Sequence, residues 1–148
     1  MTTKRIAPPS DAQLWVERTG ERTYLGRSAS GSTVLMGPEG TAGGFTPGEL
    51  LQLALAGCAG MSSDLAASRR LGPDAPRVIV VSATKHETED RYAQLHETVL
   101  MDYSALDGPA QDQLLTTVNR AIGEHCTVGL TLEHAAAIDR TVVNTPAV

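Results

Sequence analysis

Short stretches in which apolar and polar residues alternate open the chain and predict strands. Alternation over residues 13–26, broken by Thr19-Gly20-Glu21, predicts a β-hairpin. Residues 32–36 form another short apolar-rich run and predict a third strand, which Gly37-Pro38 ends. Residues 1–12 are polar and contain prolines, and we expect a loose N-terminal arm there.

The longest apolar segment predicts a helix with well-marked ends. Thr46 suits the N-cap, Pro47 suits the first helical position, and Glu49 completes a capping box with Thr46. Gly72-Pro73 ends the helix. At 1.5 Å per residue, the roughly 25 residues between these signals form a rod of about 38 Å.

The first half of this helix, residues 50–61, is apolar on nearly every face and should therefore be buried on nearly every side. A domain of this size can hardly surround such a helix alone. Gly57 and Gly60 would let another backbone approach closely. We therefore expect a homodimer with this helix in a shared core.

The second half of the chain continues with strands and a helix. Residues 77–84 predict a strong strand, and residues 94–103, after a charged turn, its partner. A helix is expected from about Pro109 to Cys126, and residues 135–143 predict a final strand that closes the sheet. The order β-β-β-α-β-β-α-β predicts an α+β fold, with residues 1–148 as one domain.

Composition narrows the classes of function. Apolar residues make up 41% of the chain, charged residues 20%, and the net charge is −5, so neither nucleic acid nor an anionic membrane surface is an expected partner. The N-terminus does not resemble a secretory signal, and residues 50–61 are shorter than the ~20 residues that cross a bilayer. We therefore expect a cytoplasmic protein. We also expect no cofactor, because no phosphate-binding glycine motif is present.

The chain has two cysteines, Cys58 and Cys126, each on the apolar face of a predicted helix. In the cytoplasm such thiols are reduced, metal-binding or catalytic more often than permanently bonded. Both could also be small buried hydrophobes. A catalytic Cys58 needs a stabilised thiolate, but it lies 12 positions past Thr46, too far from the helix start for the helix dipole to stabilise it. Arg22 or Arg27 could stabilise the thiolate instead. On a regular strand only one of these two side chains would face inward.

Histidines give weaker signals. His125 and Cys126 are neighbours on the predicted helix and point about 100° apart, which disfavours one metal ion between them. A Cys–His hydrolase with His125 or His134 as the base lacks an orienting acid at a recognisable spacing. We therefore expect no metal site.

Three motifs together resemble the OsmC/organic hydroperoxide resistance family. They are the helix start at residues 46–51, Ala56-Gly57-Cys58, and Cys126-Thr127-Val128 on the second helix. They are similar to the family's N-P-E-x-L start, its A-x-C and its distal C-P-V. Thr19-Gly20-Glu21-Arg22 aligns with the T-G-G-R of the hydroperoxide-resistance branch. The resemblance covers most of the chain.

This resemblance implies a thiol peroxidase and an intertwined homodimer whose two long central helices are wrapped by antiparallel sheets. Cys58 would attack an organic hydroperoxide, Cys126 would resolve the sulfenic acid as a disulfide, and an external dithiol would reduce the pair. Arg22 (or Arg27) would anchor the thiolate and the peroxide, with Glu49 as its partner.

One departure from the family pattern leaves a second interpretation open. The family's glutamate directly follows the proline at the helix start, where this chain has Gly48. Glu49 is displaced by about 100° around the helix and already has a role in the capping box. The alternative is a non-enzymatic dimer of the same fold that binds a small apolar ligand.

Overall fold

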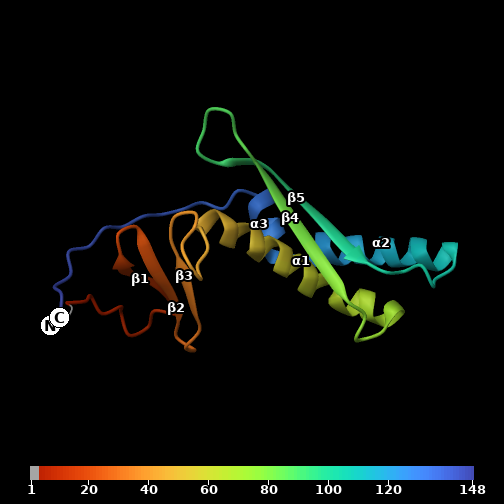
Figure 1. Ribbon diagram of the computed structural model, residues 1–148, viewed down its shortest axis with the longest axis horizontal. Helices are drawn as coiled ribbons and strands as arrows, with labels where there is room; N and C mark the ends of the chain where they lie inside the picture. The colour runs from red at the N-terminus through yellow and green to blue at the C-terminus, as the bar shows by residue number, and fades with distance from the viewer. Residues whose placement is uncertain (1–3) are drawn as a thin grey trace. The chain divides into compact units, whose positions relative to one another are not determined.

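A computed structural model describes residues 4–148 of the chain, and Figure 1 shows its elements. The backbone forms two compact units, one from residues 1–49 with 137–148 and the other from residues 50–136. The predicted arm falls partly outside the description, at residues 1–3, and residues 4–12 contain no helix or strand. Helices and antiparallel sheets together make this a mixed α/β fold, as predicted.

The first unit contains a sheet of three strands in the order β1-β2-β3. Its strands are antiparallel, which confirms the predicted hairpin and third strand, and they are β1 (Leu14–Gly20), β2 (Thr23–Ser28) and β3 (Thr33–Met36). Arg27 lies on β2 and pairs with Glu17 of β1 at 3.0 Å. Arg22 lies in the turn between these strands with a φ of 55°. The two arginines therefore do not share a regular strand.

Helix α1 (Pro47–Leu71) confirms the predicted helix and its capping box. The Thr46 N–H donates to Glu49 Oε2 at 2.7 Å, and the Glu49 N–H donates to Thr46 Oγ1 at 3.1 Å. This exchange satisfies two backbone donors of the helix start. Gly72, with a φ of 99°, takes the left-handed conformation that commonly ends a helix.

The second unit is built on a long hairpin of β4 (Arg77–Lys85) and β5 (Tyr92–Met101). Ile79 pairs with Val99 and faces α1, where its Cδ1 would lie 3.1 Å from a Cβ placed on Gly60. Since side chains alternate along a strand, every second residue from Ile79 on β4 and from Val99 on β5 lies on the same inner face. The two strands lie close to the predicted ranges, residues 77–84 and 94–103, and pair with each other as predicted.

Helix α2 (Gly108–His125) completes the core of this unit. The Asp107 side chain caps the helix by accepting the Ala110 N–H at 2.9 Å. Leu114 and Val118 on α2 pack with Ala67 of α1 in a fully buried cluster. The two helices thus hold each other in place beside the hairpin.

The predicted final strand at residues 135–143 is wrong. Cys126 ends α2 and begins a third helix, α3 (Thr127–Glu133), and the chain from His134 to Val148 contains no helix or strand. Val142 is 99% exposed, so the apolar residues at 142 and 143 do not lie against a sheet. A strand needs a partner edge for its backbone groups, and these residues pair with neither sheet. The described residues form two separate sheets, with no strand joining them.

Burial of α1 on nearly every side is not achieved within this chain. Leu55, Ala56 and Ala59 are buried, whereas Met61 is 83% and Leu65 62% exposed. By length and composition alone, the whole of α1 could cross a membrane, whereas the shorter range 50–61 was expected not to. Core helices of soluble proteins pass the same test. One face of α1 is thus apolar and uncovered.

Candidate functional site

The fold brings the two cysteines, 68 positions apart in sequence, to one place. Cys58 lies on α1 and is partly buried, and Cys126 lies between α2 and α3 and is buried. Both are free thiols, and Cys126 lies near enough to Cys58 to contribute to the lowering of its pKa. Their proximity does not depend on how the two compact units are arranged, because both belong to the second unit.

The first turn of α3 surrounds the sulfur of Cys58 with hydrogen-bond donors. The backbone N–H of Val128 has the largest effect in lowering the pKa of Cys58, and Cys126, Ser62 and the Thr127 N–H add to it against the effect of burial. The first N–H groups of a helix have no partner within the helix and carry its positive end. A thiolate at Cys58 is therefore favoured, which is the form that acts as a nucleophile.

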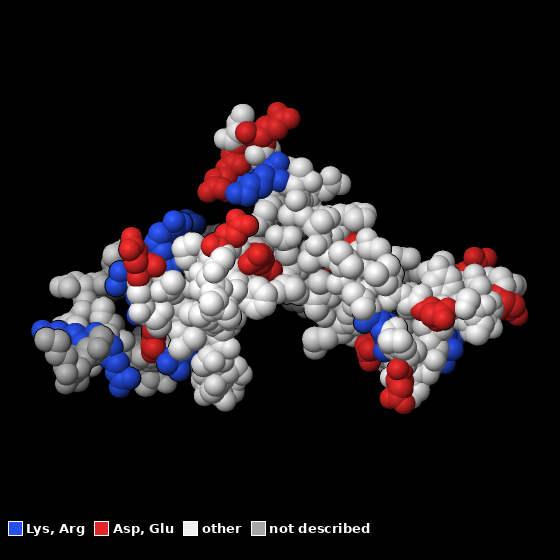
Figure 2. All heavy atoms as spheres, in the orientation of Figure 1, with Lys and Arg blue, Asp and Glu red and all other residues white. Residues whose placement is uncertain are grey.

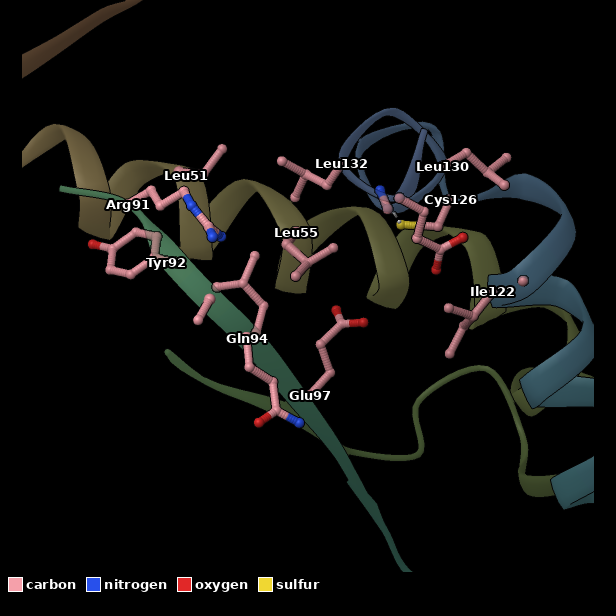
Figure 3. Close-up of a pocket in the computed structure, with 15 residues that line it drawn as sticks. Leu51, Leu55, Arg91, Tyr92, Gln94, Glu97, Ile122, Cys126, Leu130 and Leu132 are labelled. Atoms are coloured by element: carbon pink, nitrogen blue, oxygen red, sulfur yellow. Dashed lines mark hydrogen bonds between the residues drawn. The ribbon is translucent and has the colours of Figure 1, made fainter. Parts of the chain in front are cut away.

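Cys126 has the opposite character. Burial is the main cause that raises the pKa of its thiol, and the charges of Cys58 and Glu97 act in the same direction. Its Sγ accepts the Gly129 N–H at 3.4 Å and so caps α3 (Figure 3). The pair thus consists of one thiol that ionises readily and one that stays protonated.

Sequence reasoning missed α3 and therefore the groups that act on Cys58. We expected a cation to stabilise the thiolate, but backbone N–H groups and two side chains account for the lowered pKa. The signal was present in Cys126 itself, followed by a run capable of a short helix. Cysteine is not among the residues preferred at an N-cap, so capping rules did not indicate it.

Neither α1 nor the second unit places the other predicted site residues, Arg22, Arg27 and Glu49, beside Cys58. Arg22 and Arg27 belong to the first unit. Glu49 shares α1 with Cys58 but lies nine positions earlier, about 180° around the helix. Its carboxylate is held by the Thr46 N–H. The structure thus shows a capping function for Glu49, and the catalytic function stays a prediction.

A cavity of about 540 Å³ adjoins Cys126. Segments of α1, β5, α2 and α3 line it, and Figure 3 shows these side chains. Its apolar wall consists of Leu51, Leu55, Ile122, Leu130 and Leu132. Cys126 lies in this lining, so a small organic molecule could approach the site along an apolar surface.

Glu97 is a functional candidate that the sequence analysis did not identify. It lines the cavity, and its Oε1 atom is buried without a hydrogen-bond partner. Burial raises the pKa of its carboxyl group. Glu97 pairs with Val81 on the inner face of the hairpin, where apolar residues precede and follow it at alternate positions. A charged residue in that register was the available signal, because buried carboxylates usually have a functional or structural partner.

Metal ligands are not clustered in the part of the chain that the structure describes. Residues 4–148 contain no group of three or more His, Cys, Asp or Glu side chains placed to hold an ion. The groups described at this site are two thiols, a carboxyl group and backbone donors.

Comparison with known proteins identifies relatives of similar length. Uncharacterized proteins of Mycobacterium bovis and Mycobacterium tuberculosis are each 47% identical over 132 residues, which cover 89% of this chain and 96% of theirs. Their names carry no activity.

Solved structures share the fold at low sequence identity. A putative osmotic stress induced and detoxification response protein from Psychrobacter arcticus is 19% identical, with a TM-score of 0.62 over 81% of this chain and 87% of its own. An organic hydroperoxide resistance protein of Bacillus subtilis is 19% identical, with a TM-score of 0.50 over 80% and 89%. An OsmC-like protein of unknown function from Vibrio cholerae is also 19% identical, with a TM-score of 0.53 over 76% and 80%.

The family model described as OsmC-like protein matches residues 40–140, a range that contains both cysteines and all three helices. This match extends over more than half of the chain and agrees with the motifs around Cys58 and Cys126. The chain therefore belongs to the OsmC-like protein family.

Proposed function

We propose that this protein is a thiol peroxidase that reduces organic hydroperoxides to alcohols. The Cys58 thiolate attacks the outer oxygen of the hydroperoxide, and the O–O bond breaks. The products are a sulfenic acid and an alkoxide, which takes a proton from water to become the alcohol. Cys126 then displaces the hydroxyl group from the sulfenic acid, which gives a disulfide and water. An external dithiol returns both cysteines to the thiol state.

The observation that carries this proposal is the contrast between the two neighbouring thiols at the start of α3. Backbone donors, chiefly the Val128 N–H, lower the pKa of Cys58, whereas burial raises that of Cys126. An attacking thiol works best as a thiolate, and a resolving thiol needs to stay unreactive until the sulfenic acid has formed. The OsmC-like family also includes peroxidase members, which supports this direction of chemistry.

Arg22 and Glu49 enter the proposal as supporting residues. A guanidinium group stays charged at any working pH and suits the negative charge that develops on the leaving oxygen. Arg22 is the proposed anchor, with Arg27 as the second candidate. Arg27 already pairs with Glu17, which leaves Arg22 the less committed of the two. Glu49 is the proposed partner of that arginine, in addition to its capping function.

We further propose that the working form is a cytoplasmic, intertwined homodimer. The exposed apolar side chains of α1, including Met61 and Leu65, offer a surface that a second copy would cover. Val78, Val80 and Leu100 form a second exposed apolar surface, on the outer face of the hairpin. Figure 2 shows this hairpin with charged side chains concentrated at its tip, so its body is free for such a contact.

The test is to mix the fully reduced protein with one equivalent of cumene hydroperoxide and to count free thiols over time. The peroxidase proposal predicts rapid loss of both thiols per chain and an intramolecular disulfide by mass spectrometry. Cys58→Ser provides the control, because its remaining thiol, Cys126, should survive. Thiols that persist for minutes in the unsubstituted protein would contradict the proposal.

A second candidate function is non-catalytic binding of a small apolar ligand. The cavity of about 540 Å³ with its leucine-rich wall favours it, as does Gly48 at the position of the family's glutamate. Here, an apolar fluorescent probe should bind equally well to the unsubstituted protein and to a variant in which both cysteines are serine. A variant with Leu130→Trp, which fills the cavity, should bind it less tightly.

A further inference from the structure

We infer that Glu97 accepts the proton of Cys126 in the second step, when Cys126 attacks the sulfenic acid of Cys58. This inference rests on the proposed peroxidase function and assigns a base to its resolving step. Glu97 comes from the middle of β5, a segment outside the family motifs at Cys58 and Cys126.

The geometry places a free carboxyl oxygen and a protonated thiol on the same cavity. Both Glu97 and Cys126 line it, and Oε1 of Glu97 is buried without a hydrogen-bond partner. Figure 3 shows the carboxyl group directed from β5 toward the side of the cavity where Leu55 and Cys126 lie. The cavity is large enough for a water molecule to bridge the two groups where they are not in direct contact.

The resolving step requires a base because Cys126 is a thiol, not a thiolate, at neutral pH. Burial raises its pKa, and Cys58, the other thiol, is already consumed as the sulfenic acid. A carboxyl group whose own pKa is raised is a better proton acceptor than an ordinary exposed one. Glu97 therefore has the right protonation behaviour for this step.

Other charged and titratable groups around the cavity suit the function less well. On β5 and the turn before it, Arg91 pairs with Glu89, and the Tyr92 hydroxyl accepts a hydrogen bond from Gln52. On α3, Glu133 is exposed, so water solvates its charge. The cavity residues of α1 and α2 are apolar, apart from Cys126 and a glycine. Glu97 is thus the acidic residue of this cavity whose carboxyl oxygen is buried and has no hydrogen-bond partner.

The step balances without any additional reagent. The carboxylate of Glu97 takes the proton from the Cys126 thiol, and the sulfur forms a bond with Cys58 Sγ. The S–O bond of the sulfenic acid breaks, and the leaving hydroxide takes the proton back from Glu97 to become water. The hydroperoxide has already supplied the oxidation in the first step, so this condensation is redox-neutral.

Electrostatics favours Glu97 over water as the acceptor of this proton. The charge of Glu97 adds to the effects that raise the pKa of Cys126, because a carboxylate and a thiolate on the same cavity repel each other. Loss of the proton to water would leave both negative charges side by side, whereas transfer to Glu97 keeps a single negative charge at the site. The carboxylate thus keeps Cys126 protonated at rest and accepts its proton when the sulfenic acid is present.

The experiment measures the two steps separately in Glu97→Gln, with Glu87→Gln as the control, because Glu87 lies exposed in the turn of the same hairpin and does not line the cavity. Sulfenic acid formation is followed by dimedone labelling in a Cys126→Ser background, and condensation by loss of the second thiol with Cys126 intact. We expect Glu97→Gln to leave the first step unchanged and to slow condensation by about tenfold or more. Glu87→Gln should leave both steps unchanged, and Glu97→Asp should restore part of the condensation rate.

The pH profile of condensation in the unsubstituted protein gives a readout that a structural role would not change. Its rate should rise with pH as Glu97 ionises, above the usual carboxyl range because its pKa is raised, and Glu97→Gln should remove that rise. Equal condensation rates in both proteins, or equal slowing of both steps, would overturn the inference while the peroxidase function stands. Absence of any sulfenic acid in the Cys126→Ser protein would instead mean that the proposed function itself fails.

Discussion

The sulfur of Cys58, on the long helix α1, lies against the backbone N–H of Val128, the second residue of the short helix α3. A side chain in the middle of one helix thereby gains the electrostatic environment of another helix's first turn. Cys126 begins that same helix as its N-cap, so the two thiols share one short piece of backbone. The reactivity of both follows from how α3 is oriented.

The pH dependence of alkylation should separate the two thiols. Because the pKa of Cys58 is lowered and that of Cys126 is raised, a larger fraction of Cys58 is thiolate at any pH below its pKa. Iodoacetamide should therefore label Cys58 first, and the rate at Cys58 should reach half its maximum at a lower pH. Peptide mapping after timed labelling measures both rates in one sample. Faster labelling of Cys126 would contradict the assignment of the two thiols.

Single cysteine substitutions should stop the reaction at different points. Cys58→Ser removes the nucleophile, so we expect no turnover with cumene hydroperoxide and a dithiol. Cys126→Ser leaves the first step, so one alcohol per chain should form before the protein stalls as a sulfenic acid. Product counting by chromatography checks both outcomes. Continued turnover of Cys58→Ser would show that the attacking residue is elsewhere.

Substitutions at the start of α1 should separate capping from catalysis. Thr46→Ala should lower the free energy of unfolding by about 0.5–2 kcal/mol, because the Glu49 N–H loses its acceptor. Glu49→Gln keeps a side chain that serves a capping box and should change stability little. Urea unfolding measures both effects.

Peroxidase assays on Glu49→Gln then decide its second role. If Glu49 only caps the helix, this variant should turn over cumene hydroperoxide at the unsubstituted rate. A loss of about a hundredfold with unchanged stability would instead show that its carboxylate takes part in the chemistry.

A charge on the exposed face of α1 should prevent dimer formation. Met61 is 83% exposed in the single chain, and a second copy would bury it. Met61→Glu would then place an unpaired carboxylate in an apolar interface, which costs several kcal/mol. Sedimentation analysis should show a dimer for the unsubstituted protein and for the control Met61→Leu, and a monomer for Met61→Glu. A dimer that tolerates the glutamate would place the interface on another surface.

The local elements of this chain could be predicted because their signals lie within a few residues of one another. Thr46 and Glu49 define the start of α1 by hydrogen bonds that span one helical turn, and the alternation before and after the turn at residues 19–21 defines the first hairpin. Residues 135–143 show the limit of the same reasoning. They were expected to close the sheet as a last strand, but neither sheet of the described residues includes them.

The two cysteines were identifiable from the sequence, and their motifs indicated the family to which the chain belongs. Only the tertiary structure decided which groups act on their sulfurs, because the Val128 N–H reaches Cys58 across 70 positions of sequence. Glu97 likewise acquires its raised pKa from burial in a cavity formed by four separate elements. Electrostatic effects depend on distance and solvent exposure in space, and neither quantity is encoded in local sequence order.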